Sequence, residues 1–127
     1  MRKFALTLLF SAVAFGAFAQ NPTIEELKKG DSVQFEIRKD GTMAYLAVRL
    51  WENNTYVAGV YFGPESEYSE EAEILTVGAI RGEQLELSLM EDADAGPVFY
   101  VTFPDGRARL YMEGSSSEPI TMQRKRK

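Results

Sequence analysis

MAYLAVRLWENNTYVAGVYF, residues 43–62, is the stretch that decides the fold. Two runs of apolar and aromatic residues, of types that suit a pleated, half-buried backbone, flank the turn-forming pair Asn53 and Asn54. Asparagine tolerates the positive φ that a two-residue type I′ turn requires at both central positions. The stretch therefore predicts a β-hairpin in which Trp51 lies opposite Tyr56.

Both faces of this predicted hairpin are apolar. One face would carry Tyr45, Arg49, Trp51, Tyr56 and Phe62. The other would carry Leu46, Val48, Leu50, Val57 and Tyr61. Neither face is suited to water alone, so one must line the interior while a helix, a second sheet or a second subunit covers the other. A homodimer is one arrangement that would satisfy this requirement.

The turn at Lys39–Gly41, which precedes the hairpin, decides which face is inside. A three-residue turn with a glycine bulge would place Phe35 of the preceding strand opposite Tyr45, whereas a two-residue type I′ turn would place it opposite Leu46. A shift of one residue moves every side chain to the other face. We favour the bulged turn and an aromatic interior, because Pro104–Gly106 repeats the Asp-Gly pattern with a proline suited to its first position.

The whole chain reads as a series of short extended segments. Eight strands are predicted, joined mostly by hairpin-length turns, which is the pattern of an up-and-down antiparallel meander. Closure would remove both exposed edges and leave room for side chains or one small ligand. A short helix is predicted over Asn21–Gly30, with a capping box of Thr23 and Glu26, either as a lid over the sheet or as a frayed arm. The predicted fold class is all-β: an eight-stranded antiparallel meander, closed or nearly closed into a barrel, with a short N-terminal helix.

The N-terminus has the pattern of a secretory signal peptide. A basic start and an apolar run lead to the small-residue cleavage site Ala17-Phe18-Ala19. We therefore predict a signal peptide over 1–19, a single β-barrel domain over 20–123 and a basic tail over 124–127. The mature chain is expected to have no integral membrane segment, which needs ~20 apolar residues, and to reside in the periplasm or outside the cell.

Composition argues against catalysis. The sequence has no histidine and no cysteine, which removes the commonest general base, the usual zinc ligands and the thiol nucleophile. We expect no catalytic residue, no cofactor and no metal, since Asp92–Gly96 lacks the third ligand and final glutamate of a calcium loop and resembles a solvated acidic turn. The net charge of −5 argues against a nucleic-acid partner.

The layout of the chain resembles the small lipocalin-like barrels of the calycin group. The resemblance is carried by a signal peptide, a short helix, an eight-strand meander with an Asp-Gly turn after its first strand, and a last strand that ends near an arginine. The glycine-x-tryptophan signature of lipocalins is missing, because Trp51 lies on the second predicted strand after Leu50. The resemblance implies a barrel that holds a small apolar ligand, and it transfers no binding residue.

Arg49 is the residue that most suggests a ligand. Its neighbours on the predicted aromatic face are apolar, and a buried guanidinium needs a partner such as a ligand carboxylate, unless it extends to water across the indole. We therefore expect a non-enzymatic secreted barrel that binds a small apolar or amphipathic ligand inside, lined by Tyr45, Arg49, Trp51, Tyr56 and Phe62. The alternative is a protein-binding module, an envelope adaptor or an inhibitor of a secreted hydrolase, that uses its acidic loops or an outer apolar face.

Overall fold

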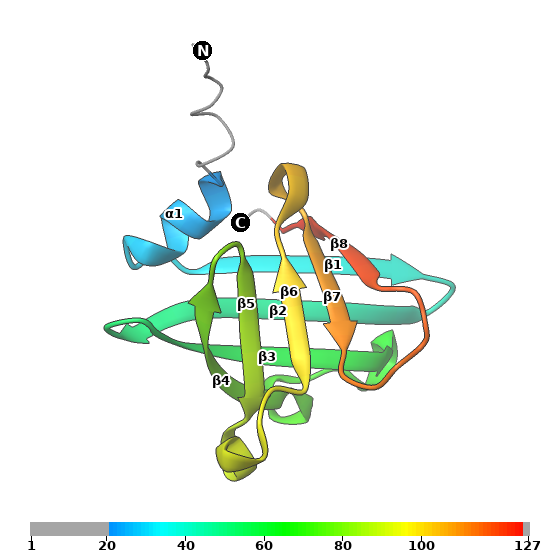
Figure 1. The fold of residues 1–127 in the computed structure, drawn as a ribbon. Coiled ribbons are helices and arrows are strands. Elements are labelled where there is room, and N and C mark those ends of the chain that lie inside the picture. Colours follow the sequence, from blue (N-terminus) through cyan, green and yellow to red (C-terminus); the bar gives the residue numbers. More distant parts are fainter. Residues whose placement is uncertain (1–20, 126–127) are drawn as a thin grey trace.

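A computed structural model of the protein describes residues 21–125, so the predicted signal peptide over 1–19 lies outside the described residues. Eight antiparallel strands pair in sequence order, and β8 pairs with β1 to close the barrel (Figure 1). The strands are β1 (Val33–Lys39), β2 (Thr42–Glu52), β3 (Thr55–Pro64), β4 (Ile74–Arg81), β5 (Gln84–Leu89), β6 (Phe99–Thr102), β7 (Ala108–Met112) and β8 (Ile120–Arg124). The predicted eight-stranded, all-β closed meander is confirmed.

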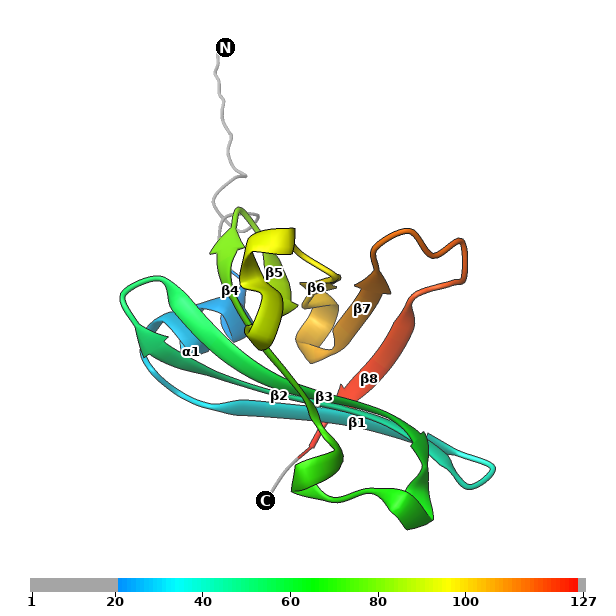
Figure 2. The ribbon, with the colours of Figure 1, turned by 90° about the horizontal axis from the view of Figure 1, so that it is seen from below.

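Two walls of unequal length make up the barrel. Strands β1, β2 and β3 are long and form one wall, and the shorter β5, β6 and β7 cross them on the other side (Figures 1 and 2). Aromatic rings join the walls across the interior. The ring of Phe35 on β1 lies 5.8 Å from that of Phe103, and the ring of Phe62 on β3 lies 6.0 Å from that of Phe99 on β6.

The turn between β1 and β2 is the two-residue type I′ turn and not the bulged turn that we favoured. Lys39 pairs with Thr42, and the two residues between them both have positive φ, 53° at Asp40 and 80° at Gly41. This register places Phe35 opposite Leu46. The interior side of β2 is therefore its aliphatic face, the second of the two alternatives.

A β-bulge at Trp51 changes the register of the central hairpin. Glu52 pairs with Thr55, but the next pair is Leu50 with Tyr56, so the predicted pairing of Trp51 with Tyr56 is wrong. The bulge lets the aliphatic face of β2 and the tyrosine on β3 point into the same core, while Trp51 is left 59% exposed.

Helix α1 (Pro22–Lys28) covers one end of the barrel, as the lid alternative predicts. Ile24 and Leu27 are buried in the core, which explains why so short a helix is held in place. The cap is Asn21 and not Thr23, because the Asn21 side chain accepts hydrogen bonds from the backbone N–H groups at 23 and 24.

The far end of the chain ties this lid to the barrel. Arg124, the first residue of the predicted basic tail, belongs to β8, and its guanidinium donates to both carboxylate oxygens of Glu26 on α1 at 2.8 and 3.3 Å. The backbone N–H of Lys125 donates to the carbonyl of Gln34 on β1 at 2.8 Å. The barrel therefore extends at least to Lys125.

Candidate functional site

The five residues predicted to line one pocket are divided between two faces. Tyr56 and Phe62 point into the barrel and belong to its core. Tyr45, Arg49 and Trp51 lie on the outer face of β2, because Leu46, Val48 and Leu50 take the inner positions between them. The prediction that all five share one inward face is therefore wrong, and the cause is the one-residue shift at the two turns.

Side chains fill the space that was predicted to hold a ligand. The core cluster includes residues from all eight strands, and the two ring pairs described above span it from wall to wall. Its fully buried members include Phe35, Tyr56, Leu46, Leu85, Leu87, Leu110 and Met122. The inner face of the barrel is thus a packed core.

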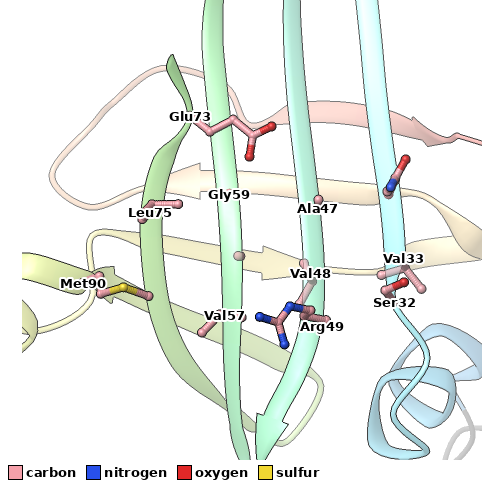
Figure 3. A pocket seen from close by; sticks show the side chains of 12 residues that line it. Ser32, Val33, Ala47, Val48, Arg49, Val57, Gly59, Glu73, Leu75 and Met90 are labelled. Carbon is pink, nitrogen blue, oxygen red and sulfur yellow. The ribbon is translucent and has the colours of Figure 1, made fainter. Parts of the chain in front are cut away.

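A hollow of about 480 Å³ lies instead on the outer face of β1–β4 (Figure 3). We call it the outer groove; it is lined by Ser32, Val33, Gln34, Ala47, Val48, Arg49, Val57, Ala58, Gly59, Glu73, Leu75 and Met90. Its volume falls within the range of ~300–1,000 Å³ typical of small-molecule sites. The groove contains one of the predicted ligand-binding residues, Arg49.

Small residues form the floor of the outer groove. Gly59 on β3 pairs with Ala47 on β2 and with Leu75 on β4, so the sheet is low at its centre. A Cβ added at Gly59 would lie 2.1 Å from the Oε1 atom of Glu73. The carboxylate of Glu73 therefore lies directly over the glycine, in space that any other residue would occupy.

The two walls that matter for binding are an apolar one and a cationic one. Leu75 is 58% exposed, and Met90 and Val57 continue the apolar surface beside it (Figure 3). The guanidinium of Arg49 projects over the groove next to Val57. Within residues 21–125 the side chain of Arg49 makes neither a hydrogen bond nor an ion pair, so its donors remain free for a ligand.

The acidic connection between β3 and β4 packs against the barrel as a strap. We call residues 64–73 the acidic strap; it contains 3-10 turns at Glu65–Glu67 and Glu70–Ala72. The ring of Tyr68 meets those of Tyr45 and Tyr61 edge-on, with centroids 5.5 and 5.2 Å apart. This small outer core, which also includes Met43, explains how the outer position of Tyr45 is buried.

A hydrogen bond links the acidic strap to the outer groove. Glu73 is the last residue of the strap, and its Oε2 atom accepts a hydrogen bond from the hydroxyl of Tyr68. The other carboxylate oxygen of Glu73 lies over Gly59. The strap is also held by an ion pair between Glu65 and Arg38. The hydrogen bond thus joins the carboxylate in the groove to a tyrosine that packs outside it.

This arrangement predicts a loss of stability in alkali. Burial raises the pKa of Tyr68, and the hydrogen bond and negative charge of Glu73 raise it further. The folded state thus holds this proton more tightly than the unfolded chain, in which a tyrosine has a pKa of about 10. The contribution of Tyr68 to the free energy of unfolding should therefore be fully present below about pH 10. It should decrease as the pH rises above that value.

Tyr68→Phe should reduce this alkaline fall, measured by urea unfolding at several pH values from about 8 to 12. Part of the fall should remain, because burial also raises the pKa values of Tyr45 and Tyr56. Equal slopes of stability against pH for the variant and the unaltered protein would contradict the assignment.

Neither a metal centre nor a spanning helix is present in the described part of the chain. No group of three or more acidic side chains in residues 21–125 is placed to hold a metal ion. The stretch Asp92–Gly96, compared above with a calcium loop, lies at the end of the exposed 3-10 segment Met90–Ala95, with Gly96 as its C-cap. Across the same residues, no helix has the length and apolar character needed to cross a bilayer.

Comparison with protein-family models, with curated proteins and with solved structures finds no match to this chain. Of the features described, the outer groove combines a free cation, an exposed apolar wall and a floor of small residues.

Proposed function

We propose that the protein is a non-enzymatic binding protein, exported by its predicted signal peptide, that holds a small amphipathic anion in the outer groove. The observation that carries this proposal is the guanidinium of Arg49, which has no partner among the described residues and lies beside exposed apolar side chains. An arginine in such a place is suited to a carboxylate, because its planar donors match both oxygens.

The packed core supports a site outside the barrel over one inside it. A ligand in the interior would have to displace side chains such as Phe35 and Leu46, neither of which is exposed. Removing such contacts costs about 2–5 kcal/mol for each large side chain. A ligand in the outer groove displaces no core side chain. The proposed site therefore differs from the interior site that the lipocalin-like layout implies.

The groove offers a contact surface for both the charged head and the apolar body of an amphipathic ligand. The head would bind Arg49 at the protein surface, and the apolar body would cover Leu75 and Met90. Burying ~100 Å² of that wall would contribute about 2.5 kcal/mol to binding. Together with one charged hydrogen-bonding head group, this predicts modest affinity, on the order of micromolar to millimolar.

The experiment is a titration with octanoate followed by the backbone amide signals of the protein. The largest shifts are expected at Ala47, Gly59 and Leu75, which line the groove, and Arg49→Gln should weaken binding about tenfold. Arg109→Gln is the matched control, because this exposed arginine lies on β7, away from the groove. Shifts centred on core residues such as Leu87, or none at all, would refute the outer site.

The second candidate is a protein-binding surface, and the exposed indole of Trp51 favours it. Trp51 lies two residues from Arg49 on the same outer face, and tryptophan and arginine are the residues that dominate many protein interfaces. Size-exclusion chromatography of the protein and of Trp51→Ser tests this role in self-association. If the unaltered protein is a dimer and the variant is a monomer, the result would favour a protein-binding surface. If both proteins are monomers, the result would favour the small-ligand site.

A further inference from the structure

The outer groove carries an unpaired charge of each sign. Arg49 supplies the positive charge, and the carboxylate of Glu73 supplies the negative one over Gly59. Within residues 21–125 no ion pair joins these two side chains, and neither pairs with another charged group. Elsewhere on the same outer surface, charges do find partners, as Arg38 does with Glu65 and Glu36.

The two charges lie at opposite ends of the hollow. Gly59, beneath the carboxylate, pairs with Ala47, whereas Arg49 and its partner Val57 are two residues farther along both strands. At about 3.4 Å per residue this places the two levels about 7 Å apart along the sheet. Figure 3 shows the carboxylate of Glu73 near one end of the groove and the guanidinium near the other.

The region between the charges is apolar on its floor and on one side, and the opposite side carries the polar Gln34 of β1, which pairs with Ala47. The floor is Ala47 and Gly59, and the apolar side is formed by Leu75 beside Gly59 and by Met90 nearer the guanidinium end. A ligand with charge at one end alone would leave the other protein charge partly desolvated and without a partner, which is unfavourable. A ligand with both charges would satisfy both ends while its body covers the apolar side.

From this geometry we infer that the preferred ligand of the outer groove is a small zwitterionic amphiphile, with its carboxylate on Arg49 and its ammonium on Glu73. The inference rests on the proposed function and adds the second charge and the orientation. The hydrogen bond from Tyr68 leaves one oxygen of Glu73 facing the groove, so the ammonium has an acceptor there without any change in the strap.

The test compares ω-aminooctanoate with octanoate and with octylamine on the full protein. The zwitterion is expected to bind about tenfold more tightly than either single-charged ligand, as measured by calorimetry and by the amide shifts of Gly59 and Ala47. Glu73→Gln should remove the preference for the zwitterion and leave octanoate binding at least as strong. Arg49→Gln should weaken both octanoate and the zwitterion.

A matched variant separates the effect of the Glu73 charge on ligand binding from the effect of its hydrogen bond to the strap. Tyr68→Phe removes the hydrogen bond and keeps the carboxylate, so the preference for the zwitterion should persist in it. If octanoate binds but ω-aminooctanoate gains nothing, the inferred second charge is wrong while the proposed function stands. If none of the three ligands binds in the groove, the proposed function itself fails.

Discussion

Replacing Gly78 with alanine is expected to destabilise the barrel by about 3 kcal/mol, the upper end of what overpacking usually costs. Gly78 lies on β4 between Tyr56 of β3 and Leu87 of β5. A Cβ at this position would lie 1.6 Å from the carbonyl oxygen of Glu86 and 2.7 Å from its carbonyl carbon. These are backbone atoms of a paired strand, so they cannot rotate away, and β4 would have to separate from β5.

Urea unfolding followed by far-ultraviolet circular dichroism measures this loss. The control is Ala79→Val, which adds atoms to the next residue of β4, on the opposite face of the sheet. Its effect should stay within about 0.5 kcal/mol, because valine suits a strand and Ala79 is only partly buried on the outer face. A Gly78→Ala protein with an unchanged unfolding midpoint would show that β4 and β5 are not in close contact at this point.

The fold could be predicted because its signals are local. Alternation of apolar and polar residues identifies a strand such as β1 or β5, and the Asp-Gly and Asn-Asn turns each separate one strand from the next. Short turns then force the strands on either side to pair, and eight such strands in succession can close into a barrel. None of these steps depends on knowing which side of a strand faces inward.

The register could not be predicted because both faces of β2 are apolar. Tyr45 and Leu46 are equally acceptable core residues, so hydrophobicity alone does not choose between them. The choice depends on φ at Asp40 and Gly41 and on a bulge at Trp51, and Asp-Gly is compatible with both turn types. A burial preference also fails to decide, since the acidic strap buries Tyr45 on the outer face.

Only part of the candidate site could be predicted from the sequence, because the other part depends on residues that are distant along the chain. Arg49 was identified from its apolar neighbours, but the groove around it needs Glu73 and Met90, which come from connections beyond the hairpin. Gly59 was the available signal, because a glycine inside a strand often marks a close approach by another group. Which group approaches is decided by the strap, and the sequence alone does not place the Glu73 side chain.

Replacing Phe35 with alanine is expected to destabilise the protein by about 4 kcal/mol, within the range for large aromatic residues in cores. Its ring is fully buried, packs against that of Phe103 and has the Arg124 guanidinium 5.9 Å above it. Phe35 also lies at the seam that closes the barrel, where β1 and β8 share two register pairs, Phe35 with Arg124 and Glu36 with Gln123. A cavity at this point therefore weakens the interior and the closure together.

Hydrogen exchange separates that double effect from a simple loss of packing. In Phe35→Ala the amides of β8 should exchange faster relative to those of β3, because the seam opens before the rest of the barrel. Ile37→Ala is the control, since Ile37 shares a strand and a face with Phe35 but is 40% exposed at the barrel end, and its cost should be about 1 kcal/mol. Equal losses for both variants, with uniform exchange across the strands, would mean that closure does not depend on the ring of Phe35. Phe35→Leu, which leaves a smaller cavity, should give an intermediate loss and keeps the comparison possible if the alanine variant does not fold.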